Sequence, residues 1–184
     1  KMRKFEINSL VIKSIKDLID NSYDQTLKKK LDDLHYADIA EVIDELNTDQ
    51  ATYLVKLLDS EKTADALAEI DEDIRENILE KLSAKEIAEE IEELDTDDAA
   101  DLIAELPEDR KERVMSQITN FDHAKDIREL LKYDENTAGG LMAKELVKVE
   151  ESLSVLKCLN TMRAQAEEVT RVHSIYVVDK NNIL

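Results

Sequence analysis

The chain has 184 residues, and 25 Lys and Arg against 44 Asp and Glu leave it with a formal net charge of −19. Hydrophobic residues make up 42% of the sequence, with only two Gly and one Pro, which favours a helical core over a turn-rich β-fold. So large a negative charge makes nucleic acid and an anionic membrane surface poor partners, and a cationic ligand a natural one.

Cysteine use and hydropathy point to the cytosol. Cys158 is the only cysteine, so it cannot form an internal disulfide, and it has no CxxC neighbour for zinc. No stretch approaches the roughly 18 apolar residues of a membrane span, and the first residues lack the apolar core of a signal peptide. We expect a cytosolic chain that does not insert into a membrane. Because it stops in what resembles the middle of a strand pair, we also expect it to be a piece of a longer protein.

The helical part contains an internal repeat. Residues 1–34, with eight basic and six acidic residues, show apolar spacing that predicts one or two leading helices. After them, ADIAEVIDELNTDQATYLVKLL at 37–58 aligns without gaps on KEIAEEIEELDTDDAADLIAEL at 85–106, an offset of 48 residues. Helical spacing in blocks of about a dozen residues, each ending before a capping residue, predicts short helices joined by tight turns.

Eight such helices are expected after residue 34, near 37–46, 48–58, 60–70, 73–82, 84–94, 96–106, 108–119 and 123–133. Helices this short are marginal alone and must bury their apolar faces on their neighbours. The sequence therefore predicts a mainly α fold, a superhelix of short stacked helical hairpins over residues 1–134 with about ten helices. Its handedness does not follow from the sequence.

The pattern changes at TAGGLM, residues 137–142, which holds both glycines of the chain. ELVKVEES then alternates like a strand, SVLKCLNTMRAQ has a helical period, and HSIYVVDKNNIL reads as a strand, a polar turn and the start of another strand. This β-α-β order predicts a second, incomplete α/β domain over residues 135–184.

The expected helix at 96–106 is unusually acidic. Residues 83–109 hold twelve acids and one base, more than half of the net charge. Acids in the first helical turn complement the helix dipole, but Asp101 lies in the second turn and repels Asp97 one turn away. Two interpretations stay open at this point: a solvated acidic face, or carboxylates held for a hard divalent cation such as Mg²⁺ or Ca²⁺. There is no EF-hand loop, so such a site would be assembled between elements.

Four stretches together resemble the cytosolic part of MgtE-type magnesium transporters: LHYADIAEVIDEL (34–46), LDTDDAADLIAELPED (94–109), LLKYDENTAGGLMAKELVKV (130–149) and YVVDKNNIL (176–184). In that family a helical N domain is followed by a pair of CBS modules and a transmembrane channel. The resemblance implies that residues 135–184 begin the first CBS module. It also implies a homodimer on the cytoplasmic face of the cell membrane, with the transmembrane domain as a further partner.

The resemblance implies a magnesium sensor. In the family, Mg²⁺ between acids of the N domain and the CBS modules holds the cytosolic dimer compact and the pore closed. The N-domain ligand positions are occupied here by Asp65, Asp97 and Asp101. Asp65 stands where relatives often have Glu, so its reach is shorter. The partner carboxylates would lie beyond Leu184.

Two other functions stay open. An acidic helical scaffold could bind a basic protein partner, and a CBS module could sense an adenine nucleotide. We do not expect an enzyme, because His35, His123 and His173 show no catalytic spacing and the sequence has no phosphate loop and no GxSxG motif.

Overall fold

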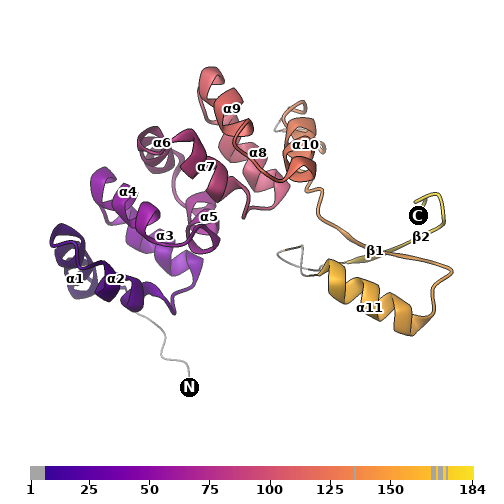
Figure 1. Ribbon diagram of the computed structural model, residues 1–184, viewed down its shortest axis with the longest axis horizontal. Coiled ribbons are helices and arrows are strands. Elements are labelled where there is room, and N and C mark those ends of the chain that lie inside the picture. The colour runs from indigo at the N-terminus through magenta and orange to yellow at the C-terminus, as the bar shows by residue number, and fades with distance from the viewer. Residues whose placement is uncertain (1–6, 135, 167–168, 170–171, 173) are drawn as a thin grey trace. The chain divides into compact units, whose positions relative to one another are not determined.

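The computed structural model describes residues 7–134, 136–166, 169, 172 and 174–184. Figure 1 shows the order of its elements. The helices are α1 (Ser9–Asp20), α2 (Asp24–Leu31), α3 (Tyr36–Asp44), α4 (Thr48–Leu57), α5 (Ser60–Glu69), α6 (Glu72–Lys81), α7 (Ala84–Ile91), α8 (Thr96–Ala104), α9 (Glu108–Met115), α10 (Phe121–Leu130) and α11 (Val155–Gln165). The strands are β1 (Val147–Glu150) and β2 (Ile175–Val178). The eight predicted helices after residue 34 correspond to α3–α10, and the leading section forms α1 and α2.

The chain divides into two compact units. The first runs up to Leu94 and continues with Leu102–Ala124, and the second comprises Asp95–Asp101 and Lys125–Leu184. The first turn of α8 therefore belongs to the second unit. The expected boundary at residue 134 stays a prediction.

Stacking of alternate helices builds the first unit. α3 packs on α5, α5 on α7 and α7 on α9, while α4 packs on α6 and α1 packs on α2 and α4. Equivalent positions of the 48-residue repeat are buried in both copies, as in the pairs Ile39 and Ile87 and Ile43 and Ile91. Each such aliphatic side chain contributes about 1.5–3 kcal/mol on burial. The predicted superhelix of stacked hairpins is confirmed.

The helix starts are closed by local caps. Asn8 accepts hydrogen bonds from two amides of α1, and His35, Asn47 and Ser83 form capping boxes at α3, α4 and α7. In the box at α7, Glu86 accepts from the Ser83 amide at 2.7 Å, and this bond, aided by Lys56, lowers the pKa of Glu86 to about 2. These caps satisfy amides that have no partner inside the helix.

Side chains from later helices close several helix ends. The Arg75 guanidinium on α6 donates to the carbonyls of Leu67, Ala68 and Ile70 at 3.0–3.1 Å and also pairs with Glu105. Arg110 on α9 donates in the same way to two carbonyls at the end of α6. Cationic groups suit these positions because the carbonyl end of a helix carries partial negative charge.

One carboxyl lies in the core of the first unit. Glu90 on α7 is only 5% exposed and accepts hydrogen bonds of 2.7 and 2.9 Å from the Thr63 hydroxyl on α5. In the repeat it occupies the position of Val42. Burial raises the pKa of Glu90 to about 7 against the opposing Thr63 hydrogen bond, and the charges of Glu89 and Glu93 add to the increase.

The second unit contains a β-α-β segment. β1 and β2 pair in parallel, with Val147 opposite Ile175 and Val149 opposite Val177, and α11 connects them. Val147 and Val149 are buried, whereas α11 buries no side chain. After β2 a tight turn is organised by Asp179, whose carboxylate accepts from the Asn181 and Ile183 amides. The expected strand–helix–strand order is confirmed, and the segment is compatible with a partial CBS module.

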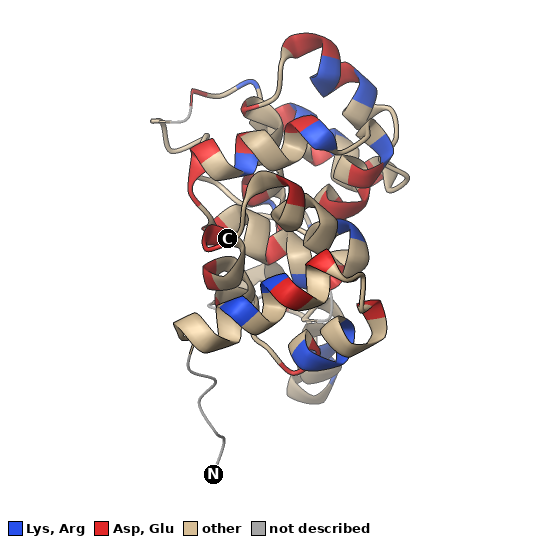
Figure 2. Ribbon diagram, turned by 90° about the vertical axis from the view of Figure 1, so that its left-hand side faces the viewer, with Lys and Arg blue, Asp and Glu red and all other residues tan. Residues whose placement is uncertain are grey.

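Acidic positions occur along most helices, as Figure 2 shows in red, with basic positions in blue between them. Several of the basic side chains pair with acids about 30 residues away in sequence, such as Lys56 with Glu86 at 3.0 Å and Lys62 with Asp32 at 3.1 Å. These pairs are partly exposed, so each adds little stability. These ion pairs help to align one helical layer with the next.

Replacing Arg75 with Ala is expected to lower the free energy of unfolding by about 2–3 kcal/mol, because three carbonyls and the Glu105 carboxylate lose a charged donor. Urea unfolding followed by circular dichroism measures this. Arg113→Ala is the control, since the exposed Arg113 side chain contacts the carboxylate and the carbonyl of Asp109 one turn away and should change stability by less than about 0.5 kcal/mol. Equal effects of the two substitutions would contradict this role of Arg75.

The buried Glu90 predicts that stability falls as pH rises. Between pH 4.5 and 7 the folded chain binds more protons at Glu90 than the unfolded chain does. The free energy of unfolding therefore falls through this range, and the loss of stability is complete above it. Glu90→Gln is therefore expected to stabilise the protein by up to about 3 kcal/mol at pH 8 and to give little gain at pH 4.5. Urea unfolding at both pH values tests this, with the exposed Glu80→Gln on α6 as control. A gain that does not depend on pH would refute it.

Candidate metal-binding helix

The candidate site is built on α8, whose two faces differ. Ala99, Leu102, Ile103 and Leu106 are buried, as the helical spacing predicts. On the other side, Asp97 is partly exposed and Asp101 is exposed. The apolar face therefore fixes the helix, and the acids are left accessible to solvent.

The structure places the three predicted ligands on two helices. Asp97 and Asp101 lie one turn apart on α8, where side chains four residues apart are neighbours about 5–6 Å apart at Cβ. Asp65 is partly exposed on α5, two residues after the buried Thr63, and belongs to the first unit. Asp97 and Asp101 are thus brought together by the helix itself.

The start of α8 is held by residues from just before β1. The Glu145 carboxylate accepts from the Thr96 amide at 3.1 Å and from the Thr96 hydroxyl at 2.8 Å. The Lys144 amide donates back to the same hydroxyl at 3.0 Å. The Lys144 ammonium pairs with Glu129 at 2.8 Å, and this hydrogen bond lowers the pKa of Glu129 and raises that of Lys144.

A close packing contact explains the glycine of the TAGGLM stretch. A Cβ on Gly139 would lie 2.5 Å from the Tyr133 ring, far inside van der Waals contact. Any larger residue at 139 would displace the ring or the backbone. The packing of Tyr133 against position 139 therefore requires a glycine there, in the segment that leads into β1.

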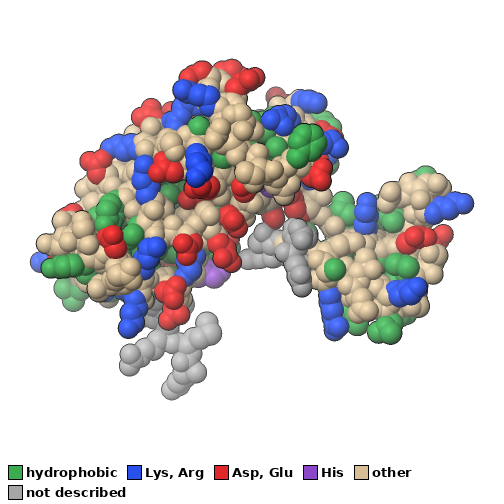
Figure 3. Space-filling view, in the orientation of Figure 1, with side chains coloured by type: hydrophobic (Ala, Val, Ile, Leu, Met, Phe, Trp, Pro, Cys, Tyr) green, Lys and Arg blue, Asp and Glu red, His purple; other side chains and the backbone are tan. Residues whose placement is uncertain are grey.

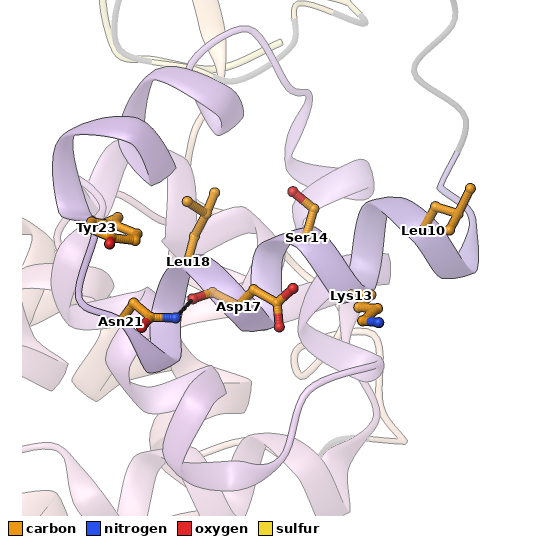
Figure 4. Close-up of a pocket in the computed structure, with 7 residues that line it drawn as sticks. All are labelled: Leu10, Lys13, Ser14, Asp17, Leu18, Asn21 and Tyr23. Atoms are coloured by element: carbon orange, nitrogen blue, oxygen red, sulfur yellow. Dashed lines mark hydrogen bonds between the residues drawn. The ribbon is translucent and has the colours of Figure 1, made fainter.

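Two cavities of about 270 Å³ lie outside the acidic helix. One adjoins the two-stranded sheet, where Ala143, Glu145, Val172, Ser174 and Tyr176 are among its lining residues. The other lies along α1 and the turn after it, and Figure 4 shows its seven lining residues. This second cavity contains none of the predicted ligands.

The chemistry of α8 suits a hard cation. Carboxylate oxygens are the ligands that Mg²⁺ takes, and Mg²⁺ keeps several waters, so one or two carboxylates from each of two surfaces are enough. Among the described residues, no three or more His, Cys, Asp or Glu side chains gather in an arrangement that could hold a metal ion. Asp97 and Asp101 alone therefore form no complete cage, and their role as ligands stays a prediction.

Two carboxyls with structural roles were not predicted from the sequence, Glu145 beside the start of α8 and Glu90 in the core of the first unit. Glu145 lies 49 positions from Thr96, and no local pattern indicates their pairing. The buried Glu90 was visible in principle, because the repeat aligns it with Val42. A carboxyl at an otherwise apolar core position is the signal that the alignment contained.

These features define a helical domain of stacked hairpins that presents an acidic helix and leads into an α/β module. The sequence profile of the MgtE intracellular N domain matches residues 34–136, more than half of the chain. The chain therefore belongs to the MgtE intracellular N domain family. No helix among the described residues is long and apolar enough to cross a membrane.

A curated relative and two solved structures agree with this assignment. The magnesium transporter MgtE of Thermus thermophilus is 40% identical over 55 residues, which cover 30% of this chain and 12% of that protein. The soluble part of a magnesium transporter shares the fold, with a TM-score of 0.81 at 24% identity over 94% of this chain and 68% of the other. The cytosolic domain of the Mg²⁺ channel MgtE in complex with ATP gives a TM-score of 0.83 at 27% identity, over 94% and 71%.

Proposed function

We propose that this chain belongs to the Mg²⁺-sensing cytosolic region of a magnesium transporter or channel. The observation that carries the proposal is the pair Asp97 and Asp101, solvent-accessible and one turn apart on a helix of an MgtE N domain. Asp65 on α5 is proposed as a further ligand. The remaining ligands would come from CBS modules of the same protein.

Repulsion between acids supplies the conformational signal. Two unit charges about 4 Å apart repel by roughly 1 kcal/mol in water and about 4 kcal/mol near a protein surface. Acidic surfaces that face each other without a cation therefore favour separation, and a bound Mg²⁺ favours contact. Because the ion binds the compact arrangement better, it shifts the population toward it, and the compact arrangement corresponds to the closed pore.

We also propose partners for this chain within the full-length protein. Its own CBS modules and a transmembrane domain are the proposed partners in the full-length protein, at the cytoplasmic face of the cell membrane. Homodimerisation through the CBS modules is also proposed. The β-α-β segment exposes several apolar side chains, which supports a continuation of this module: Val155, Leu156, Ile175, Tyr176 and Val177. Figure 3 shows hydrophobic side chains in green on the surface of this segment.

A second candidate function is adenine-nucleotide binding by the β-α-β segment. Two observations favour it: the ATP complex of the structurally similar MgtE cytosolic domain, and the cavity of about 270 Å³ beside β1 and β2. This volume is close to the lower end of small-molecule sites. Tyr176 and Val172 offer apolar surface there, and Ser174 a hydroxyl.

Mg²⁺ is expected to stabilise the complete cytosolic region through α8. At ten times its dissociation constant, an ion bound to the folded state adds about 1.4 kcal/mol, or about 3–5 °C in Tm for a chain of this size. Asp97→Ala combined with Asp101→Ala should remove most of this shift, as measured by calorimetry. The matched control removes two first-turn acids of α6, with Glu72→Ala and Asp73→Ala.

Two calorimetric results would oppose the sensor. One is an unchanged Mg²⁺ shift in the Asp97 and Asp101 variant. The other is a wild-type protein that ignores Mg²⁺ at concentrations on the order of ten millimolar, where loosely held hard ions bind. Stabilisation by a basic protein instead would favour the scaffold function.

If the cavity beside the sheet takes ATP, filling it should weaken binding. Ala143→Trp is expected to reduce ATP affinity at least about tenfold, because the indole occupies the space that the ligand needs. Isothermal titration measures the affinity. Leu10→Trp, in the α1 cavity of similar volume, should leave it unchanged. Wild-type affinity in the Ala143 variant, or no ATP binding at all, would rule out this nucleotide site.

A further inference from the structure

Glu145 makes the longest-range polar contact at the start of α8. Both of its carboxylate oxygens are used, one by the Thr96 amide and one by the Thr96 hydroxyl, across 49 positions of sequence. Thr96 is only 1% exposed, and its hydroxyl also accepts from the Lys144 amide. The contact is therefore shielded from solvent, and the Thr96 hydroxyl both donates to Glu145 and accepts from the Lys144 amide.

The connection acts on the first turn of a helix. The Thr96 amide is one of the four that have no partner inside α8, and a carboxylate at this end of a helix is stabilised by the helix dipole. Losing it would leave a buried amide and hydroxyl with fewer partners and allow the first turn to fray. Asp97, the next residue, would lose its fixed position.

The other end of the connection leads directly into the sheet. Glu145 lies two residues before Val147, which begins β1 and is buried. Lys144, next to it, is held to α10 by its ion pair with Glu129. The segment before β1 is thus fixed to two helices through adjacent residues.

We propose that Glu145 is a positioning residue that fixes the Asp97 turn of α8 to the segment entering β1, so that ion binding at α8 alters the order of β1. This inference rests on the proposed Mg²⁺-sensing function. Glu145 does not contact the ion in this scheme. It sets the position of a ligand and carries the effect of the ion into the sheet.

Glu92 provides a matched comparison within the same chain. Its carboxylate accepts from the Thr119 hydroxyl at 2.8 Å and from the Asn120 amide at 2.9 Å, just before α10. Partial burial opposes its ionisation, yet these hydrogen bonds lower the pKa of Glu92. It is a long-range carboxylate cap of the same chemistry, but on a helix that carries none of the proposed ligands.

Hydrogen exchange of the full-length protein across a Mg²⁺ titration tests the inference, with peptides that cover residues 95–104 and 146–151. In the wild type, Mg²⁺ should protect both peptides with one midpoint. Glu145→Ala should raise the midpoint at α8 by about tenfold, as loss of outer partners does for metal ligands, and should abolish the response at β1. Glu145→Gln, which keeps one acceptor, should fall between.

The control separates positioning from general stability. Glu92→Ala should loosen α10 but leave both Mg²⁺ responses as in the wild type. If the wild-type α8 peptide does not respond to Mg²⁺, the proposed function fails and the inference fails with it. If α8 responds in the wild type and both peptides respond equally well in the Glu145 variants, the inference alone is overturned.

Discussion

The fold depends on closing the ends of very short helices. A helix of eight residues leaves four amides and four carbonyls without a partner, so most of its backbone needs help from outside. Local caps serve several starts, and side chains from a later layer serve the ends, as Arg75 does for α5 and Arg110 for α6. Arg75 reaches back 5 to 8 residues to the end of α5, and Arg110 reaches back 28 to 31 residues to the end of α6, so each of these ends is closed by a helix that follows it in the chain. Apolar packing gives the stack its stability, and these polar contacts fix its spacing.

The need to close helix ends also gives the acidic side chains different roles. Glu86 caps its own helix, Glu92 and Glu145 cap helices far away in sequence, and Glu105 pairs with Arg75. These acids are committed to structure. Asp97 and Asp101 lie on the side of α8 opposite its buried face, where Asp97 is partly exposed and Asp101 is exposed. An excess of negative charge that costs stability in an isolated domain becomes useful where a divalent cation can offset it.

Periodicity was sufficient to predict the helices, the repeat and the strand–helix–strand order, because apolar spacing and capping residues are local. It was insufficient for contacts between distant positions. The pairing of Thr96 with Glu145 and the packing of Tyr133 on Gly139 arise from chain folding and leave no local pattern. Glu90 is intermediate, since the repeat alignment shows a carboxyl in place of Val42 but not the Thr63 hydroxyl that receives it. The choice of Asp65, Asp97 and Asp101 came from family resemblance and stays a prediction.

We propose that Asp97 and Asp101 on α8 hold a hydrated divalent cation. Paramagnetic broadening by Mn²⁺, which takes the same oxygen ligands, tests it most directly in ¹⁵N-labelled protein. We expect the amides of residues 96–102 to broaden at the lowest Mn²⁺ concentration and excess Mg²⁺ to restore them. Broadening that begins at other acidic helices, such as α6, and leaves α8 unaffected would contradict it.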